Sequence, residues 1–138
     1  MVARYGLPVP FEPAAFPLQD HLGILVVSTE RGLGTAALEV TPALHNPNGV
    51  VHGAVLFAMV DTAMGAATMS SLDPGLACAS IEVHLRFLRP ATAGRLSAET
   101  NVVKGGRRVV QLEGRVRDES GELVAIASGS FAVIPAVD

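Results

Sequence analysis

The pattern of apolar and polar residues along this chain of 138 residues first predicts one long helix. From Val50 to Met69 nearly every residue is apolar or small, which is typical of a helix buried on almost all sides. The turn sequence DPG at residues 73–75 stops it. We therefore expect a helix that begins near His52 or Gly53 and ends around Ser70–Leu72.

Beyond the helix the apolar pattern changes to a period of two, which is typical of strands. Ser80–Arg89 alternates between two faces and predicts a strand with one buried face, formed by Ile81, Val83, Leu85 and Phe87. A short piece before Ser80 belongs with this strand. The other predicted strands are Gly23–Thr29, Thr35–Thr41, Arg95–Val103, Arg108–Arg117 and Leu123–Ile134.

These elements predict an α+β fold in one domain that covers residues 1–138. The turns between strands are short, so the strands should pair antiparallel. A sheet that curls around the apolar helix would bury all its faces. Residues 1–20 hold four prolines and are expected to form an extended lead-in, with one short helix around Leu18–Leu22.

Composition narrows the function classes. Hydrophobic residues make up 49% of the chain and charged residues 17%, so we expect apolar surface to be buried against another copy of the chain. The net charge is −3 and the basic residues are scattered, which argues against nucleic-acid binding. The single Cys78 excludes an internal disulfide and a CxxC site. It fits a cytoplasmic location, and the N-terminal segment does not resemble a signal peptide.

Val50–Met69 is also long enough to be considered as a membrane span. Asp61 would then lie near the bilayer centre, at a cost of about 2.5–3.5 kcal/mol on insertion scales. No basic residues flank the segment. A buried helix of a soluble domain is the better interpretation, and we expect no membrane partner.

Asp61 is the clearest candidate for chemistry because it stands in the middle of the apolar helix. A buried carboxylate is costly unless it is paired, hydrogen-bonded or neutralised. One interpretation is a structural aspartate held by the backbone or by Thr62. The other is a general base or nucleophile whose basicity is raised by its dry surroundings.

Gly53 stands where the helix begins and where free backbone amides point outward. Such an amide could stabilise the oxyanion that forms when a carbonyl is attacked, although Gly53 could equally be a simple hinge. His52 is more simply interpreted as structural, and Asn48 fits turn chemistry. Asn46 is less easily explained by a turn alone, because it lies some two turns' worth of residues before the helix start. Ser80 opens the alternating strand, where it could orient a water molecule or be a strand-end hydroxyl.

Several other functions are not indicated. The sequence contains no nucleophile elbow, phosphate-binding loop, dinucleotide fingerprint or zinc-protease motif. His45, His52 and His84 match no standard metal spacing, so we expect no metal. Arg107 and Arg108 follow a Gly-Gly turn, where they could contact phosphates or form a solvated hairpin tip.

The segment HNPNGVVHGAVLFAMVDTAMG resembles the signature of hotdog-fold acyl-CoA thioesterases of the phenylacetic-acid-degradation (PaaI-like) type, a group that includes one branch of the 4-hydroxybenzoyl-CoA thioesterases. The likeness extends to SIEVHLRFLRPA and the terminal strands. It implies a curved antiparallel sheet around one long helix, and hydrolysis of an acyl-CoA thioester without a cofactor.

The resemblance also implies roles for single residues. Asp61 would be the catalytic carboxylate, Gly53 would polarise the thioester carbonyl through its amide, and Asn46 and Ser80 would help hold the thioester or the water. His52, Ala54, Arg107 and Arg108 are expected substrate contacts. The active site would form across a homodimer, and such dimers commonly pair into homotetramers.

Two turns of helix, about 11 Å, separate Gly53 from Asp61, which is too far for one thioester group to reach both. Asp61 should therefore work with the Gly53 of a different subunit.

One departure from the family pattern is Ala54, which stands where the pattern has its second glycine and puts substrate choice in doubt. An enoyl-thioester hydratase or dehydratase on the same fold, with a catalytic histidine, and a non-catalytic acyl-CoA-binding protein are the alternatives.

Overall fold

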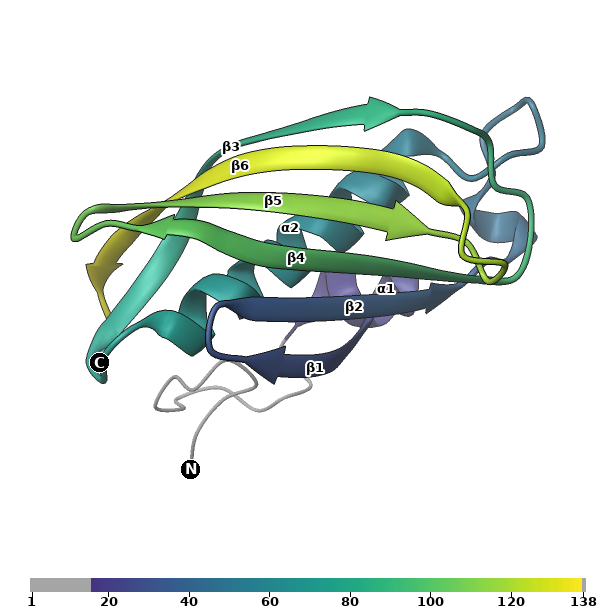
Figure 1. Ribbon diagram of the computed structural model, residues 1–138. Coiled ribbons are helices and arrows are strands. Elements are labelled where there is room, and N and C mark those ends of the chain that lie inside the picture. The colour runs from purple at the N-terminus through teal and green to yellow at the C-terminus, as the bar shows by residue number, and fades with distance from the viewer. Residues whose placement is uncertain (1–15, 138) are drawn as a thin grey trace.

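A six-stranded antiparallel sheet curves around one long helix in the computed structural model, which describes residues 16–137 (Figure 1). The strand order is β1-β2-β4-β5-β6-β3, so β1 and β3 are the two edges. The predicted α+β arrangement of a hotdog fold is confirmed. The elements are α1 (Pro17–Leu22), β1 (Leu25–Glu30), β2 (Leu33–Glu39), the short 3-10 helix η1 (Pro42–Leu44), α2 (Gly53–Ser71), β3 (Leu76–Phe87), β4 (Arg95–Gly105), β5 (Val109–Arg117) and β6 (Leu123–Pro135).

Helix α2 begins and ends where the sequence predicts. His52 adopts an extended conformation before it, and its Nδ1 accepts a hydrogen bond of 2.9 Å from the backbone N–H of Ala54. This bond satisfies one of the backbone donors that every helix leaves free at its N-terminus. At the other end, Leu72 leaves the helical conformation just before the DPG turn.

The hydrophobic core lies between α2 and the concave face of the sheet. Its fully buried side chains include Met59, Val60, Met64, Leu38, Leu96, Val110, Val116 and Val124. Helix and sheet approach closely at Gly34 of β2, where a Cβ would overlap the backbone carbonyl of Ala63. This contact holds α2 in a fixed position across β2, and with it every side chain that α2 carries.

Strand β3 departs from the sequence prediction in its pattern of burial. It begins at Leu76, as the short piece before Ser80 suggested, but the single buried face expected for it is wrong. Ile81 is 56% exposed and Phe87 57% exposed, whereas Val83 and Leu85 are half-buried. The pairing with β6 shifts register between Ser80 and Glu82, and β3 has no neighbour on its outer side. The bulge and the open edge leave these apolar side chains uncovered.

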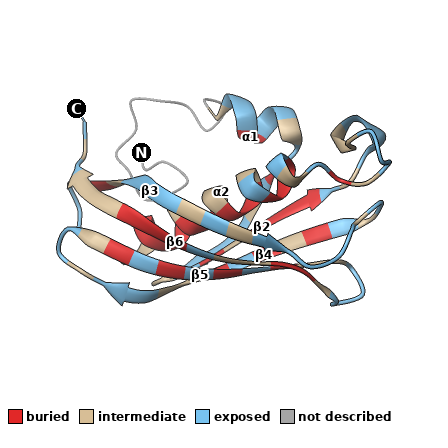
Figure 2. Ribbon diagram, turned by 90° about the horizontal axis from the view of Figure 1, so that it is seen from above, coloured by how far each residue is buried: buried red, intermediate tan, exposed pale blue. Residues whose placement is uncertain are grey.

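The sheet also leaves one side of α2 uncovered, so the expectation that all faces of the helix are buried is wrong. Ala54 and Phe57 are exposed, and Asp61, Thr62 and Gly65 are only half-buried. These positions recur every three or four residues and therefore form one stripe. The burial colours in Figure 2 show that β3, beside this stripe, is also largely exposed.

The N-terminal lead-in is only partly described. The short helix expected around Leu18–Leu22 is confirmed as α1, which begins at Pro17, and residues 1–15 of the predicted lead-in lie outside the described residues. Within residues 16–137, α2 is the one helix long and apolar enough to cross a membrane, and 56% of its apolar window is buried inside the molecule. The packing of α2 against the sheet explains its apolar sequence.

Candidate active site

A cavity of about 560 Å³ lies between α1, α2 and the first half of β3. One helical face of α2 forms its floor, with Ala58, Asp61, Thr62, Gly65 and Met69 at spacings of three and four residues. The remaining wall is mostly apolar and comes from Phe16, Pro17, Leu18, Gln19, Ile24, Cys78, Ala79, Ser80 and Phe131. Sequence reasoning identified only Asp61 and Ser80 as candidate site residues in this set.

One oxygen of the Asp61 carboxyl group lacks a hydrogen-bond partner in this cavity. This oxygen is Oδ1, which is buried and has no such partner among the described residues. This observation argues against the structural interpretation, in which Thr62 or the backbone would hold the carboxyl group. Burial raises the pKa of Asp61 above its ordinary value, and a hydrogen-bonding interaction with the Ser80 hydroxyl acts in the opposite direction. The result is a carboxylate that is more basic than usual and is free to accept a proton.

Ser80 and Cys78 approach Asp61 from β3. Cys78 is half-buried, and its Sγ lies 4.0 Å from the carbonyl oxygen of Gly65. Burial, followed by the charge of Asp61, raises the pKa of the Cys78 thiol to about 11. The thiol is therefore protonated at neutral pH and is a poor nucleophile. Of the groups on β3 that line the cavity, the Ser80 hydroxyl is the one suited to orienting water beside the carboxylate.

Gly53 lies at the other end of the same uncovered stripe, outside this cavity. It is the first residue of α2, and its N–H donates no hydrogen bond to the described part of the chain. The ring of Phe87 covers its Cα: a Cβ at Gly53 would lie 2.9 Å from Cζ of Phe87. Gly53 thus presents a free amide beside an exposed aromatic ring at the edge of the molecule.

The other candidate residues near the start of α2 have visible structural contacts. The Oδ1 of Asn46 accepts a hydrogen bond of 2.9 Å from the N–H of Asn48, which is the turn chemistry that the sequence suggested. His52 caps α2, and His45 contacts the carbonyl oxygen of Thr92 at 2.8 Å through Nε2. Within one chain, neither Asn46 nor His52 lines the cavity that contains Asp61.

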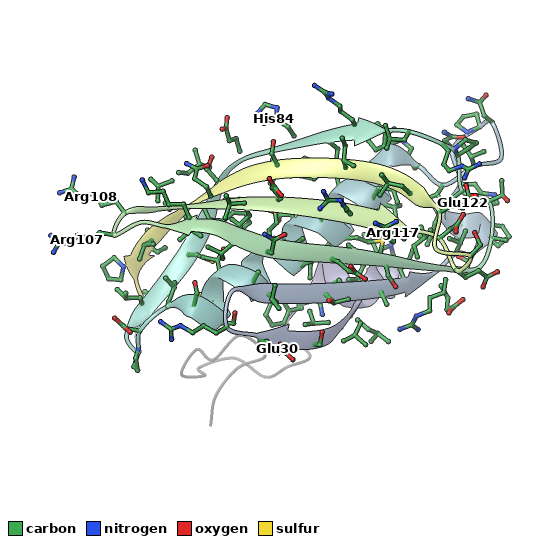
Figure 3. The ribbon with its side chains drawn as sticks, viewed as in Figure 1. Glu30, His84, Arg107, Arg108, Arg117 and Glu122 are labelled. Carbon is green, nitrogen blue, oxygen red and sulfur yellow. The ribbon has the colours of Figure 1, made fainter. Side chains whose placement is uncertain are left out.

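Arg107 and Arg108 lie at the tip of the hairpin between β4 and β5, where their side chains point away from the body of the molecule (Figure 3). Neither lines the cavity of Asp61. His84 faces outward from β3, 3.3 Å from Glu82. No group of three or more potential metal ligands occurs within residues 16–137.

Comparison with known proteins identifies the family. Residues 48–125, which include α2 and strands β3, β4 and β5, match the model of the thioesterase superfamily. This chain belongs to that superfamily. Within it, the chain is a PaaI-like hotdog protein and a thioester hydrolase, as the resemblance implied.

Individual relatives agree with this assignment. The chain is 29% identical to a 1,4-dihydroxy-2-naphthoyl-CoA hydrolase of Listeria monocytogenes, over 84% of this chain and 94% of the relative. It is 30% identical to the acyl-coenzyme A thioesterase PaaI of Escherichia coli, over 78% and 76% of the two chains. The solved structure of the Escherichia coli PaaI protein superposes with a TM-score of 0.83 at 27% identity and covers 89% of this chain and 88% of that chain.

Proposed function

We propose that this protein hydrolyses an acyl-CoA thioester to a free carboxylic acid and CoA, with Asp61 as the catalytic carboxylate. The observation that carries the proposal is the buried, unpartnered Oδ1 of Asp61 in a mostly apolar cavity. The relatives whose names specify CoA esters support a CoA ester as the substrate.

The reaction follows from the properties of these groups. A water molecule oriented by Ser80 gives a proton to Asp61 and attacks the thioester carbonyl carbon. The negative charge that develops on the carbonyl oxygen is stabilised by the free N–H of Gly53, aided by the positive end of the α2 dipole. When the carbon–sulfur bond breaks, the proton held by Asp61 passes to the leaving thiolate. Attack by Asp61 itself, through an acyl-enzyme anhydride, is the alternative use of the same carboxylate.

The two halves of this site must come from different chains. Gly53 and Asp61 are separated by two turns of one helix, about 11 Å, so a single thioester group cannot contact both. The open edge of β3 and the exposed Ile81, Phe57 and Phe87 offer an apolar surface beside both residues. A two-fold axis at this edge reverses the second α2, which brings the Gly53 end of one helix towards Asp61 of the other.

We propose that CoA binds near the start of α2 and near the hairpin between β4 and β5 in the same dimer. His52 and Ala54 stand at the start of α2, beside the proposed oxyanion donor. Arg107 and Arg108 are exposed cations suited to the phosphates of the nucleotide. Pairing of two dimers into a tetramer and a cytoplasmic location are further parts of the proposal, based on the resemblance and on the single cysteine.

The contacts of His52 do not favour the hydratase or dehydratase alternative. Its Nδ1 accepts the Ala54 N–H, which leaves the ring proton on Nε2, so neither nitrogen is free to remove a proton from a substrate. The non-catalytic alternative predicts tight binding of CoA esters without turnover. It does not account for a carboxylate whose pKa is raised and whose buried oxygen has no partner.

A free-thiol assay with a panel of acyl-CoA esters tests the proposal. Asp61→Asn should remove most of the activity while the circular dichroism spectrum is unchanged.

The shared site has its own test. Each mixed dimer of one Asp61→Asn chain and one Gly53→Val chain contains one site in which both residues are native. Co-refolding the two inactive variants should recover up to about a quarter of the native rate. Unchanged turnover in Asp61→Asn contradicts the mechanism, and no recovery contradicts the shared site.

A further inference from the structure

Gly65 is an unexpected residue in the middle of α2. Glycine inside a helix lowers stability by about 1 kcal/mol relative to alanine, so such a position usually has a steric reason. Two other glycines of this chain show such reasons. Cβ atoms would overlap the Ala63 carbonyl at Gly34 and approach Cζ of Phe87 to 2.9 Å at Gly53.

No described atom of the chain imposes glycine at position 65. The nearest atom to a Cβ placed there is Cε2 of Phe131, at 3.8 Å, which is an ordinary van der Waals distance. The backbone at Gly65 is helical, so its conformation does not require glycine either. Gly65 lines the cavity that holds Asp61. The missing side chain therefore leaves room for something that enters this cavity.

The position of Gly65 relative to Asp61 indicates what that is. The two residues are one turn apart on the same face of α2, about 6 Å along the helix axis. A thioester whose carbonyl carbon lies beside Asp61 and whose acyl group extends into the cavity would place the body of that group beside Gly65, one turn from the reacting atoms. The cavity there is bounded by Met69, Phe131 and Cys78, so it suits an apolar group.

We propose that Gly65 determines the size of the acyl group that the enzyme accepts, and that its missing Cβ admits an acyl group with a ring or a medium-length chain. This inference rests on the proposed thioesterase function. It identifies Gly65 as a specificity-determining residue that takes no part in the chemical step, and it predicts that acyl groups too short to reach Gly65 are insensitive to the residue at this position.

The test compares Gly65→Ala and Gly65→Val with the unaltered protein on acetyl-, hexanoyl-, benzoyl- and phenylacetyl-CoA. Both substitutions improve the intrinsic helix propensity of α2, so folding should be retained, and thermal melts check this. Gly65→Val should lower kcat/KM for the bulky esters at least tenfold relative to the smallest accepted ester, with Gly65→Ala in between. Ser28→Val, on exposed β1 at the opposite edge of the sheet, is the matched control and should leave the ratio unchanged.

Each other outcome contradicts a distinct step of the reasoning. An equal loss on all esters would mean that Gly65 serves catalysis or folding rather than selection of the acyl group. A change in molecular mass by light scattering would mean that Gly65 is needed for contact between copies of the chain. No turnover of any ester by the unaltered protein would refute the proposed function itself, whereas normal turnover with unaltered selectivity in Gly65→Val would refute only the inference.

Discussion

Replacing Asp61 by asparagine should stabilise the folded protein while it abolishes activity. Burial of Asp61 raises its pKa above the ordinary value of an aspartate, which means that folding favours the protonated carboxyl group over the charged one. The stabilisation from the protonated form is present below the ordinary pKa and is lost as pH rises through the raised pKa of the folded state. At pH 7 the ionised Asp61 therefore lowers the free energy of unfolding.

The size of the effect follows from the surroundings of Asp61. A buried polar atom without a partner, such as Oδ1, costs about 1–3 kcal/mol, and a charged one costs more. Asparagine keeps a polar atom at this place, so the gain comes from the removal of the charge alone. The side chain as a whole is only half-buried, so solvent screening reduces the charge penalty. We expect Asp61→Asn to raise the free energy of unfolding at pH 7 by about 1 kcal/mol. For a domain of this size, that gain corresponds to an increase in Tm of about 3 °C.

Urea denaturation at pH 7 and at pH 4.5, together with the free-thiol assay, measures both effects. The gain in stability should be smaller at pH 4.5, because the native carboxyl group is then closer to its protonated state. Asp61→Ala serves as a control that removes the polar group altogether. A loss of stability in Asp61→Asn at pH 7 would refute the reasoning, because it would show that the charge of Asp61 contributes favourable contacts to the fold.

Three further predictions concern the neighbouring residues. Ser80→Ala removes the hydroxyl that lowers the pKa of Asp61, so the acid limb of the pH–rate profile should move to higher pH, and an unmoved limb would contradict this interaction. Gly53→Ala places a Cβ 2.9 Å from Cζ of Phe87 and should reduce kcat at least tenfold in the thiol assay with a small change in KM. If the amide has no catalytic role, only stability should change. Ile81→Asp puts a charge on the exposed edge of β3 and should lower the mass measured by light scattering together with activity; an active monomer would contradict the shared site.

The sequence predicts the fold well because most of its signals are local. The extent of α2 follows from the apolar run and the DPG stop, and the alternation on β5 follows from a strand with one face on the core. The errors concern β3 and the uncovered side of α2. Alternation in Ser80–Arg89 reports which residues are apolar, but not whether the surface that buries them belongs to the same chain. Ile81 and Phe87 are the residues for which that difference matters.

The candidate site was predictable only in part, for a similar reason. Asp61 could be identified because a charge inside an apolar helix is rare in itself. The contribution of α1 to the cavity could not be predicted from the sequence, because it depends on where the chain before β1 returns over α2. The sequence alone shows Gly65 only as one small residue within the apolar helix. Its significance appears when the space around its Cα is known, because a glycine without a steric requirement from its own chain indicates an external occupant.

Under the proposed mechanism, the half-buried state of Asp61 would connect assembly with catalysis. In one chain the uncovered stripe of α2 leaves the Asp61 side chain partly open to water, which weakens its desolvation and screens its charge. A second subunit seated on the β3 edge would exclude this water and raise the pKa of Asp61 further. The same contact would bring the Gly53 amide of the other chain, whose partial positive charge favours the developing oxyanion. One apolar contact would therefore strengthen the base and complete the oxyanion site together, and an isolated subunit would hold a weaker base and no donor for the oxyanion.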